Sequence, residues 1–188
     1  MNRSEVRHLK LPVGDRDHAQ GPPDAPVTLV EYGDYECPFC AQAYPILKNV
    51  RKHFGTRLRF VYRNFPLSEI HPRATPAALV AETAALHGKF WEMHDLLFDH
   101  QERMSDADLA KYAAQLGIGS EAFLEGIQSE DIGRRVQEDF MGGVRSGVNG
   151  TPTFFLNGAR YDGSWYYADL VAAIDAAIRV AGEPLSQH

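Results

Sequence analysis

The sequence of 188 residues contains only two cysteines, Cys37 and Cys40. Two cysteines this close together cannot build the disulfide framework that supports many small secreted domains. In a reducing compartment, a pair with this spacing is catalytic or binds a metal. Residues 1–10 are charged throughout and contain neither the apolar stretch nor the small-residue cleavage site of a secretion signal. These absences predict a cytoplasmic protein.

Long hydrophobic runs and clusters of basic residues are missing as well. No apolar run approaches the roughly 18 to 20 residues that a membrane-spanning helix needs, so we expect no membrane insertion. The net charge is −6 and no basic stripe is present, so we expect no nucleic-acid partner. Hydrophobic residues make up 44% of the chain, which is ordinary for a globular protein. The length suits one domain that carries a large insertion.

The two cysteines lie where a predicted strand ends and a predicted helix begins. Residues 27–30 are β-prone, and residues 41–50 can form a helix. Three residues apart on a first helical turn, the two side chains share a face, and their Cα atoms come within disulfide range. Pro38 suits this turn because its missing N–H would have no partner there. A helix N-terminus stabilises a thiolate, so we predict Cys37 as the nucleophile and Cys40 as the resolving thiol.

Hydrophobic periodicity divides the chain into three parts. Residues 1–65 comprise a polar arm with a short edge strand near Leu9 to Val13, the first strand, the cysteine helix to about Phe54, and a second, parallel strand over 58–65. Residues 66–146 show only helical spacing and predict an inserted helical subdomain. Its five predicted helices cover residues 74–87, 89–100, 105–116, 120–128 and 130–145. Residues 147–188 predict a hairpin turning at Asn157-Gly158 and a last helix over about 164–180.

This order of elements resembles the DsbA-like thiol:disulfide oxidoreductases. The resemblance covers about Pro26 to Val180 and is carried by residues 27–40 with their Cys-Pro-Phe-Cys motif, by Lys89 to His94, and by Gly147 to Phe155. It implies an α/β, thioredoxin-like fold with an inserted all-helical subdomain. It also implies exchange of disulfides with protein or small-thiol substrates, glutathione among them, and a redox recycling partner that the sequence does not identify. The redox-active disulfide of the cysteines would be the only redox group, with no separate cofactor and no metal.

The resemblance also assigns roles to single residues. Pro152 is expected to follow a cis peptide bond beside the disulfide, so that the backbone of Thr151 meets an extended substrate. Pro38 and Phe39 would contribute to the substrate-binding surface. Glu31 corresponds to a buried acid with a raised pKa that accepts the proton of Cys40. Strongly oxidising relatives carry histidine where this chain has Phe39, so we expect a less oxidising couple here.

Other interpretations of the same residues stay open. The cysteines could form half a zinc site, although there is no second cysteine pair and no two of the eight histidines have zinc-finger spacing. Glu31 could be a strand-end glutamate in water, and Asp34 and Glu36 are expected to be solvated loop acids. Tyr32 and Tyr35 could line an apolar peptide groove together with the phenylalanine of the motif. A different class of function is a non-catalytic redox-sensing or peptide-binding module that works with a membrane transporter.

Overall fold

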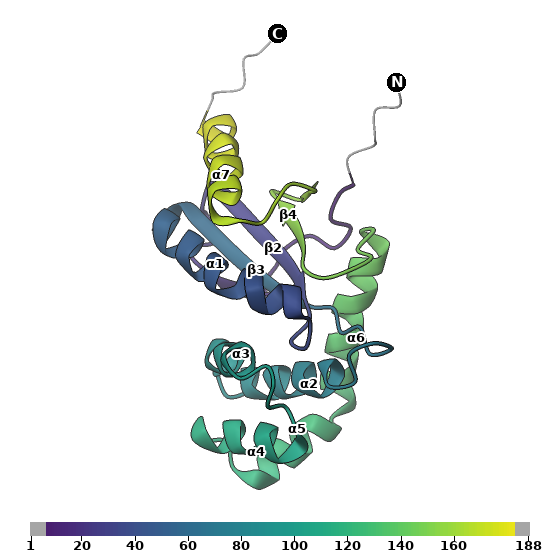
Figure 1. The fold of residues 1–188 in the computed structure, drawn as a ribbon. Coiled ribbons are helices and arrows are strands. Elements are labelled where there is room, and N and C mark those ends of the chain that lie inside the picture. Colours follow the sequence, from purple (N-terminus) through teal and green to yellow (C-terminus); the bar gives the residue numbers. More distant parts are fainter. Residues whose placement is uncertain (1–6, 183–188) are drawn as a thin grey trace.

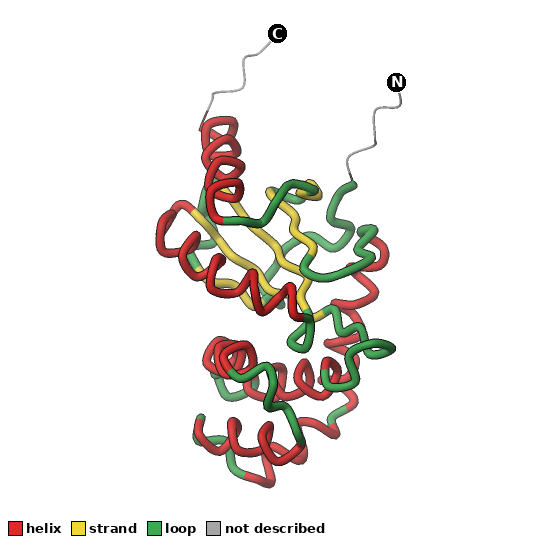
Figure 2. The backbone as a smooth tube through the Cα atoms, viewed as in Figure 1, coloured by secondary structure: helices red, strands yellow, loops and turns green. Residues whose placement is uncertain are grey.

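The computed structural model describes residues 7–182, which form a sheet covered by helices and a second layer made only of helices (Figures 1 and 2). The ends of the predicted arm and of the last segment, residues 1–6 and 183–188, lie outside the described residues. The strands are β1 (His18–Gln20), β2 (Val27–Gly33), β3 (Leu58–Asn64), β4 (Thr153–Leu156) and β5 (Ala159–Tyr161). The α-helices are α1 (Pro38–Phe54), α2 (Ala74–Ala85), α3 (Phe90–Asp99), α4 (Asp106–Gln115), α5 (Ser120–Gln128), α6 (Glu130–Arg145) and α7 (Tyr167–Gly182).

The five strands form one mixed sheet in the order β1-β3-β2-β4-β5. Strands β2 and β3 are parallel, as predicted for two strands joined by a crossover helix, and the other pairs are antiparallel. Strand β2 is central, and Glu31 on it lies between Tyr62 of β3 and Phe154 of β4. The acid is therefore surrounded by strands on both sides.

The two faces of β2 pack against different partners because its side chains alternate. Val27 and Leu29 belong to the larger core, beneath α1, α3 and α7. Val30 and Tyr32 belong to a smaller core on the opposite face, which the N-terminal arm and α6 cover. Alternation puts Glu31 on the face of Val27 and Leu29, and hence beneath the helix that carries the cysteines.

Every α-helix between β3 and β4 belongs to the second layer, which is drawn below the sheet in Figure 1. Helix α6 runs along one side of this layer and leads back to the sheet. Helix α4 begins at a capping box in which the side chains of Ser105 and Asp108 each accept a hydrogen bond from the other residue's backbone N–H. The predicted thioredoxin-like fold with an inserted set of helices is confirmed.

The predicted edge strand near Leu9 to Val13 is wrong. The edge strand is β1, several residues later, where His18–Gln20 pairs with β3. The carbonyls of Leu11 and Pro12 instead accept hydrogen bonds from the guanidinium of Arg63 at 2.8 and 3.1 Å. With its carbonyls bound by a side chain and no N–H on Pro12, this stretch cannot form a strand ladder.

Arg63 joins the arm to the sheet. Its side chain has no exposed surface, and it contacts both carboxylate oxygens of Asp17 at 2.7 and 3.0 Å. Removing one partner of a buried ion pair leaves the other charge uncompensated. We therefore expect Arg63→Met to lower the free energy of unfolding by about 3 to 5 kcal/mol, measured by urea denaturation.

Arg103 provides the matched control for this prediction. It pairs with Asp108 at 3.4 Å, but 64% of its side chain is exposed. Exposed ion pairs contribute little, so Arg103→Met should cost less than about 1 kcal/mol. Equal losses in the two variants would show that Arg63 does not hold the arm in place.

Candidate active site

Cys37 is the residue just before α1, and Pro38 is the first residue of that helix. Both cysteines are free thiols, and the Cys40 side chain is fully buried. The Sγ atom of Cys37 lies 3.3 Å from the carbonyl oxygen of Thr151, to which the thiol form donates a hydrogen bond. The Thr151–Pro152 peptide bond is cis. Two segments separated by 114 positions in the sequence thus meet at one sulfur atom.

The two sulfurs have opposite acid–base character. Hydrogen bonds from the Cys40 thiol and the Thr151 side chain, together with the backbone N–H groups of Cys40 and Phe39, lower the pKa of Cys37 to about 5. Burial raises the pKa of Cys40 well above its usual value, and the nearby charges of Cys37 and Glu31 raise it further. At neutral pH, Cys37 is therefore a thiolate and Cys40 a thiol.

Glu31 lies under these sulfurs with only 2% of its surface exposed. Burial, together with the negative charge of Cys37, raises its pKa to about 8, against the opposing effect of Arg51. Its Oε1 atom has no hydrogen-bond partner within the described part of the chain. The interpretation of Glu31 as a solvated strand-end residue is wrong, and a buried carboxyl that titrates near neutrality stands in its place.

Asp34 is a structural residue, not the solvated loop acid that the sequence suggested. It is 1% exposed, and its carboxylate accepts hydrogen bonds from the backbone N–H of Glu36 at 2.8 Å and of Leu67 at 2.9 Å. It also contacts His71 at 2.8 Å, and its own backbone N–H faces the Cys40 sulfur at 3.5 Å. An aspartate that bonds the N–H two residues later is a known turn signal, and this could have been recognised in the sequence.

Glu36 and Gln101 also hold the loop before α1 in place. The Glu36 carboxylate accepts a hydrogen bond from the backbone N–H of Arg73, so it is not a free solvated acid either. The Gln101 amide donates to the carbonyl oxygens of Tyr35 and Cys37, both at 2.9 Å. Gln101 comes from the segment after α3, so the helical layer directly supports the cysteine loop. No local pattern marks a glutamine for this role.

A family model described as Thioredoxin matches residues 14–176. The chain belongs to the thioredoxin family. Among solved structures, this thioredoxin-family chain resembles a thioredoxin-like oxidoreductase from Silicibacter pomeroyi (TM-score 0.78, 24% identity, 88% of this chain and 94% of that one). BdbD from Bacillus subtilis gives a TM-score of 0.78 at 25% identity, covering 87% and 94%. Wolbachia pipientis alpha-DsbA1 gives 0.78 at 20% identity, covering 92% and 96%.

Curated relatives of this thioredoxin-family chain are much longer proteins. It is 47% identical over 170 residues to a Na(+)/H(+) antiporter NhaA 1 of Salinispora arenicola, covering 90% of this chain and 26% of that protein. It is 46% identical over 167 residues to an NhaA 1 of Mycolicibacterium vanbaalenii, covering 88% and 27%. The chain thus spans about a quarter of the length of these relatives. Within residues 7–182, no helix has the length and apolar character to cross a bilayer.

The surface beside Cys37 is provided by Pro38 and Phe39, which are both exposed. Phe39, in the first turn of α1, has 57% of its surface in contact with solvent. Tyr32 and Tyr35 do not line a groove, because each is buried, with at most 1% exposure. Of the three aromatic residues considered for a peptide groove, only Phe39 is therefore available to a partner.

Proposed function

We propose that this protein is a thiol–disulfide oxidoreductase that acts on protein or small-thiol disulfides through Cys37 and Cys40. One observation carries the proposal. A stabilised thiolate at Cys37 adjoins the carbonyl of Thr151, and a buried, protonated thiol lies one helical turn away. Disulfide exchange needs a thiolate to attack and a second thiol to release the captured partner.

Reduction of a substrate would proceed in two exchanges. The Cys37 thiolate attacks one substrate sulfur, so that a mixed disulfide forms and the other substrate sulfur leaves as a thiolate. Glu31 then accepts the proton of Cys40, whose sulfur attacks Cys37 and frees the second substrate thiol. The substrate disulfide gains two electrons, and the two cysteines lose them as the Cys37–Cys40 disulfide forms. The same steps in reverse would oxidise a substrate dithiol.

The geometry supports a substrate position next to Thr151 and Pro152. The Thr151 carbonyl oxygen lies 3.3 Å from the Cys37 sulfur, so an extended peptide pairing with this backbone would bring its sulfur to the nucleophile. Pro38 and Phe39 would contact its apolar side chains. Glutathione is a small-thiol candidate, and the recycling partner and the cytoplasmic location stay predictions.

The direct test is reduction of insulin in the presence of dithiothreitol. A thiol–disulfide oxidoreductase accelerates insulin precipitation well above the rate with dithiothreitol alone. A rate equal to that background would overturn the proposal. The reduction potential of the couple in a glutathione buffer then gives the direction of electron flow, since a value far below the cytosolic poise implies a reductant.

Replacing Thr151 with valine tests how the thiolate is stabilised. The Thr151 hydroxyl oxygen is buried without a hydrogen-bond partner when Cys37 is a thiol, yet it stabilises the thiolate form. Valine has the same shape without the donor. We expect the pKa of Cys37 to rise by roughly one unit, measured from the ultraviolet absorbance of the thiolate against pH. Thr153→Val, on the same segment, is the control, because its hydroxyl donates to the Gly150 carbonyl at 2.7 Å instead.

A second candidate function is a redox-sensing module that works with a membrane antiporter. It is favoured by the two NhaA relatives, which contain a region similar to this chain within a protein about four times as long. Under this function, a Cys37→Ser chain still co-purifies with an antiporter from detergent-solubilised membranes. If the protein only exchanges disulfides, the Cys40→Ser chain alone retains a partner, through a mixed disulfide at Cys37. A reducing agent then releases that partner.

A further inference from the structure

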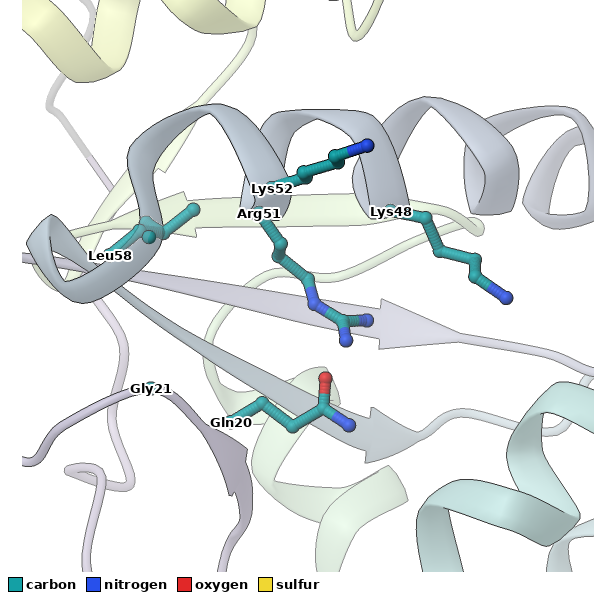
Figure 3. A pocket seen from close by; sticks show the side chains of 7 residues that line it. Gln20, Gly21, Lys48, Arg51, Lys52 and Leu58 are labelled. Carbon is teal, nitrogen blue, oxygen red and sulfur yellow. The ribbon is translucent and has the colours of Figure 1, made fainter.

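A cavity of about 340 Å³ lies beside the second half of α1, away from the cysteine end of that helix (Figure 3). Lys48, Arg51 and Lys52 line it from the helix, and Gln20 and Gly21 line it from the end of β1. Spacings of three and four positions put the three basic side chains on neighbouring parts of one helix surface. The sequence shows no basic stripe, because these charges gather on one surface only once the helix forms.

No acidic residue lines this cavity, and its basic residues are paired to different degrees. Lys48 donates to the Tyr44 hydroxyl at 2.9 Å and pairs with Asp95 at 3.5 Å, so its charge is partly neutralised. Within residues 7–182, neither Arg51 nor Lys52 has a carboxylate at ion-pairing distance. The cavity therefore contains excess positive charge.

The Arg51 guanidinium is held in position without an acid. It lies over the rings of Phe60 and Trp91, 5.4 and 5.7 Å from their centroids. In Figure 3 its planar head points from α1 towards the Gln20 amide across the cavity. The Oε1 atom of Gln20 is buried without a partner, and rotation of the amide presents its N–H₂ group instead. A preorganised guanidinium fork and an amide donor suit a ligand with several oxygen acceptors.

Gly21 completes the wall of the cavity opposite α1. Its φ of +92° lies in a region that glycine adopts more readily than other residues. A Cβ atom at this position would also come within 2.2 Å of the Leu58 carbonyl oxygen. The close approach of these two backbones keeps the end of β1 facing α1.

We propose that this cavity binds a small oxyanion between Arg51, Lys52 and Gln20, and that its occupancy is coupled to the protonation of Glu31. Arg51 connects the two positions. It packs over the ring of Phe60, which pairs with Leu29, two residues before Glu31 on the same face of β2. Its positive charge favours the ionised form of the buried carboxylate. An anion bound to the guanidinium offsets that charge and favours the protonated carboxyl. By reciprocity, protonated Glu31 increases the affinity for the anion. The consequence for catalysis rests on the proposed role of Glu31, whereas binding does not.

Several other ionisable groups lie around Glu31 and Arg51. Glu31 is influenced by the charge of Cys37, just before α1, and acts in turn on Cys40 of α1. It also lies near Tyr35 and Tyr62. Besides Glu31, Arg51 is influenced by Asp95 and Tyr44, and it acts in turn on His94 of α3. Tyr35, Tyr44 and Tyr62 all have raised pKa values because they are buried, and burial lowers that of His94, so these four groups stay neutral between pH 7 and 9.

Sulfate is the probe for binding, because its charge does not change near neutrality. The titration is followed by backbone amide NMR shifts at fixed ionic strength, and we expect shifts centred on Gln20 and Arg51. Loss of a charged hydrogen bond is worth about 1.5 to 3 kcal/mol, so Arg51→Met should weaken binding by roughly tenfold or more. Lys52→Gln tests the same site at an exposed position where folding is not at risk, and Lys111→Gln on α4 is the matched control.

Two results would overturn the site. One is the absence of shifts around Arg51 and Gln20 at the highest sulfate concentration, and the other is equal affinity in Lys52→Gln and Lys111→Gln. The coupling has its own test. Affinity in the unsubstituted protein should fall by roughly threefold to tenfold as the pH rises through about 8, and Glu31→Gln should remove that component. An identical pH profile in both proteins would refute the coupling. No turnover is measured, so a failed insulin assay would leave these results standing.

Discussion

Replacement of Cys37 with serine is expected to lower the protein-catalysed rate of insulin reduction by on the order of a thousandfold or more. Only the rate with dithiothreitol alone then remains. A serine hydroxyl keeps the shape of the side chain but is not ionised at neutral pH, so no nucleophile faces the substrate disulfide. The effect should be this large because the site holds its ionised sulfur at one position only. Cys40 cannot replace it, since burial keeps that thiol protonated.

The matched variant is Cys40→Ser, which retains the Cys37 thiolate and removes only the resolving thiol. It should attack a substrate and then stop, so that a mixed disulfide at Cys37 accumulates and is detected by intact-protein mass spectrometry. Cys37→Ser should show no such adduct. Adduct formation at Cys40 in the Cys37→Ser protein would reverse the assigned roles of the two sulfurs.

Glu31→Gln is expected to stabilise the protein, although most substitutions of buried residues destabilise it. The folded pKa of about 8 lies above the reference value of 4.5, so the carboxylate is less stable in the folded than in the unfolded chain. The resulting penalty is absent below pH 4.5, grows as the pH rises, and is complete above about 8. At pH 7 it amounts to about 3 kcal/mol.

Urea unfolding at several pH values measures this gain. Glu31→Gln should exceed the unsubstituted protein by about 3 kcal/mol at pH 7 and match it near pH 4. Glu102→Gln is the control, since Glu102 is exposed and its replacement should change little at either pH. A gain that persists unchanged at pH 4 would mean that packing, and not the ionisation of Glu31, is its cause.

The same substitution should slow the second exchange. Glutamine cannot accept the Cys40 proton, so release of a preformed mixed disulfide should slow by roughly a hundredfold, measured in a single turnover. The first exchange depends on Cys37 and should keep nearly its full rate. Equal release rates in the two proteins would remove Glu31 from the proton transfer and leave it as a destabilising buried acid.

Several parts of the site required the folded chain. Asp34 and Glu36 look solvated in the sequence because they sit in a polar loop, yet each binds backbone N–H groups from the segment that follows β3. Gln101 supports the cysteine loop from beyond α3. The position of β1 also could not be predicted, because Arg63 binds the carbonyls of the stretch that looked more like a strand.

The sequence by itself determined the elements of this protein: the central strand, the helix that begins at Pro38, the helices of the insertion, and the hairpin at Asn157-Gly158. These follow from hydrophobic periodicity, capping and turn residues, which act over a few neighbouring positions. Tertiary structure alone decided which polar groups are buried and what they meet. Thr151 reaches Cys37, and Arg51 influences Glu31, across long stretches of chain. Burial and charge depend on neighbours in space, and for this reason the pKa values that make the site reactive arise only in the folded protein.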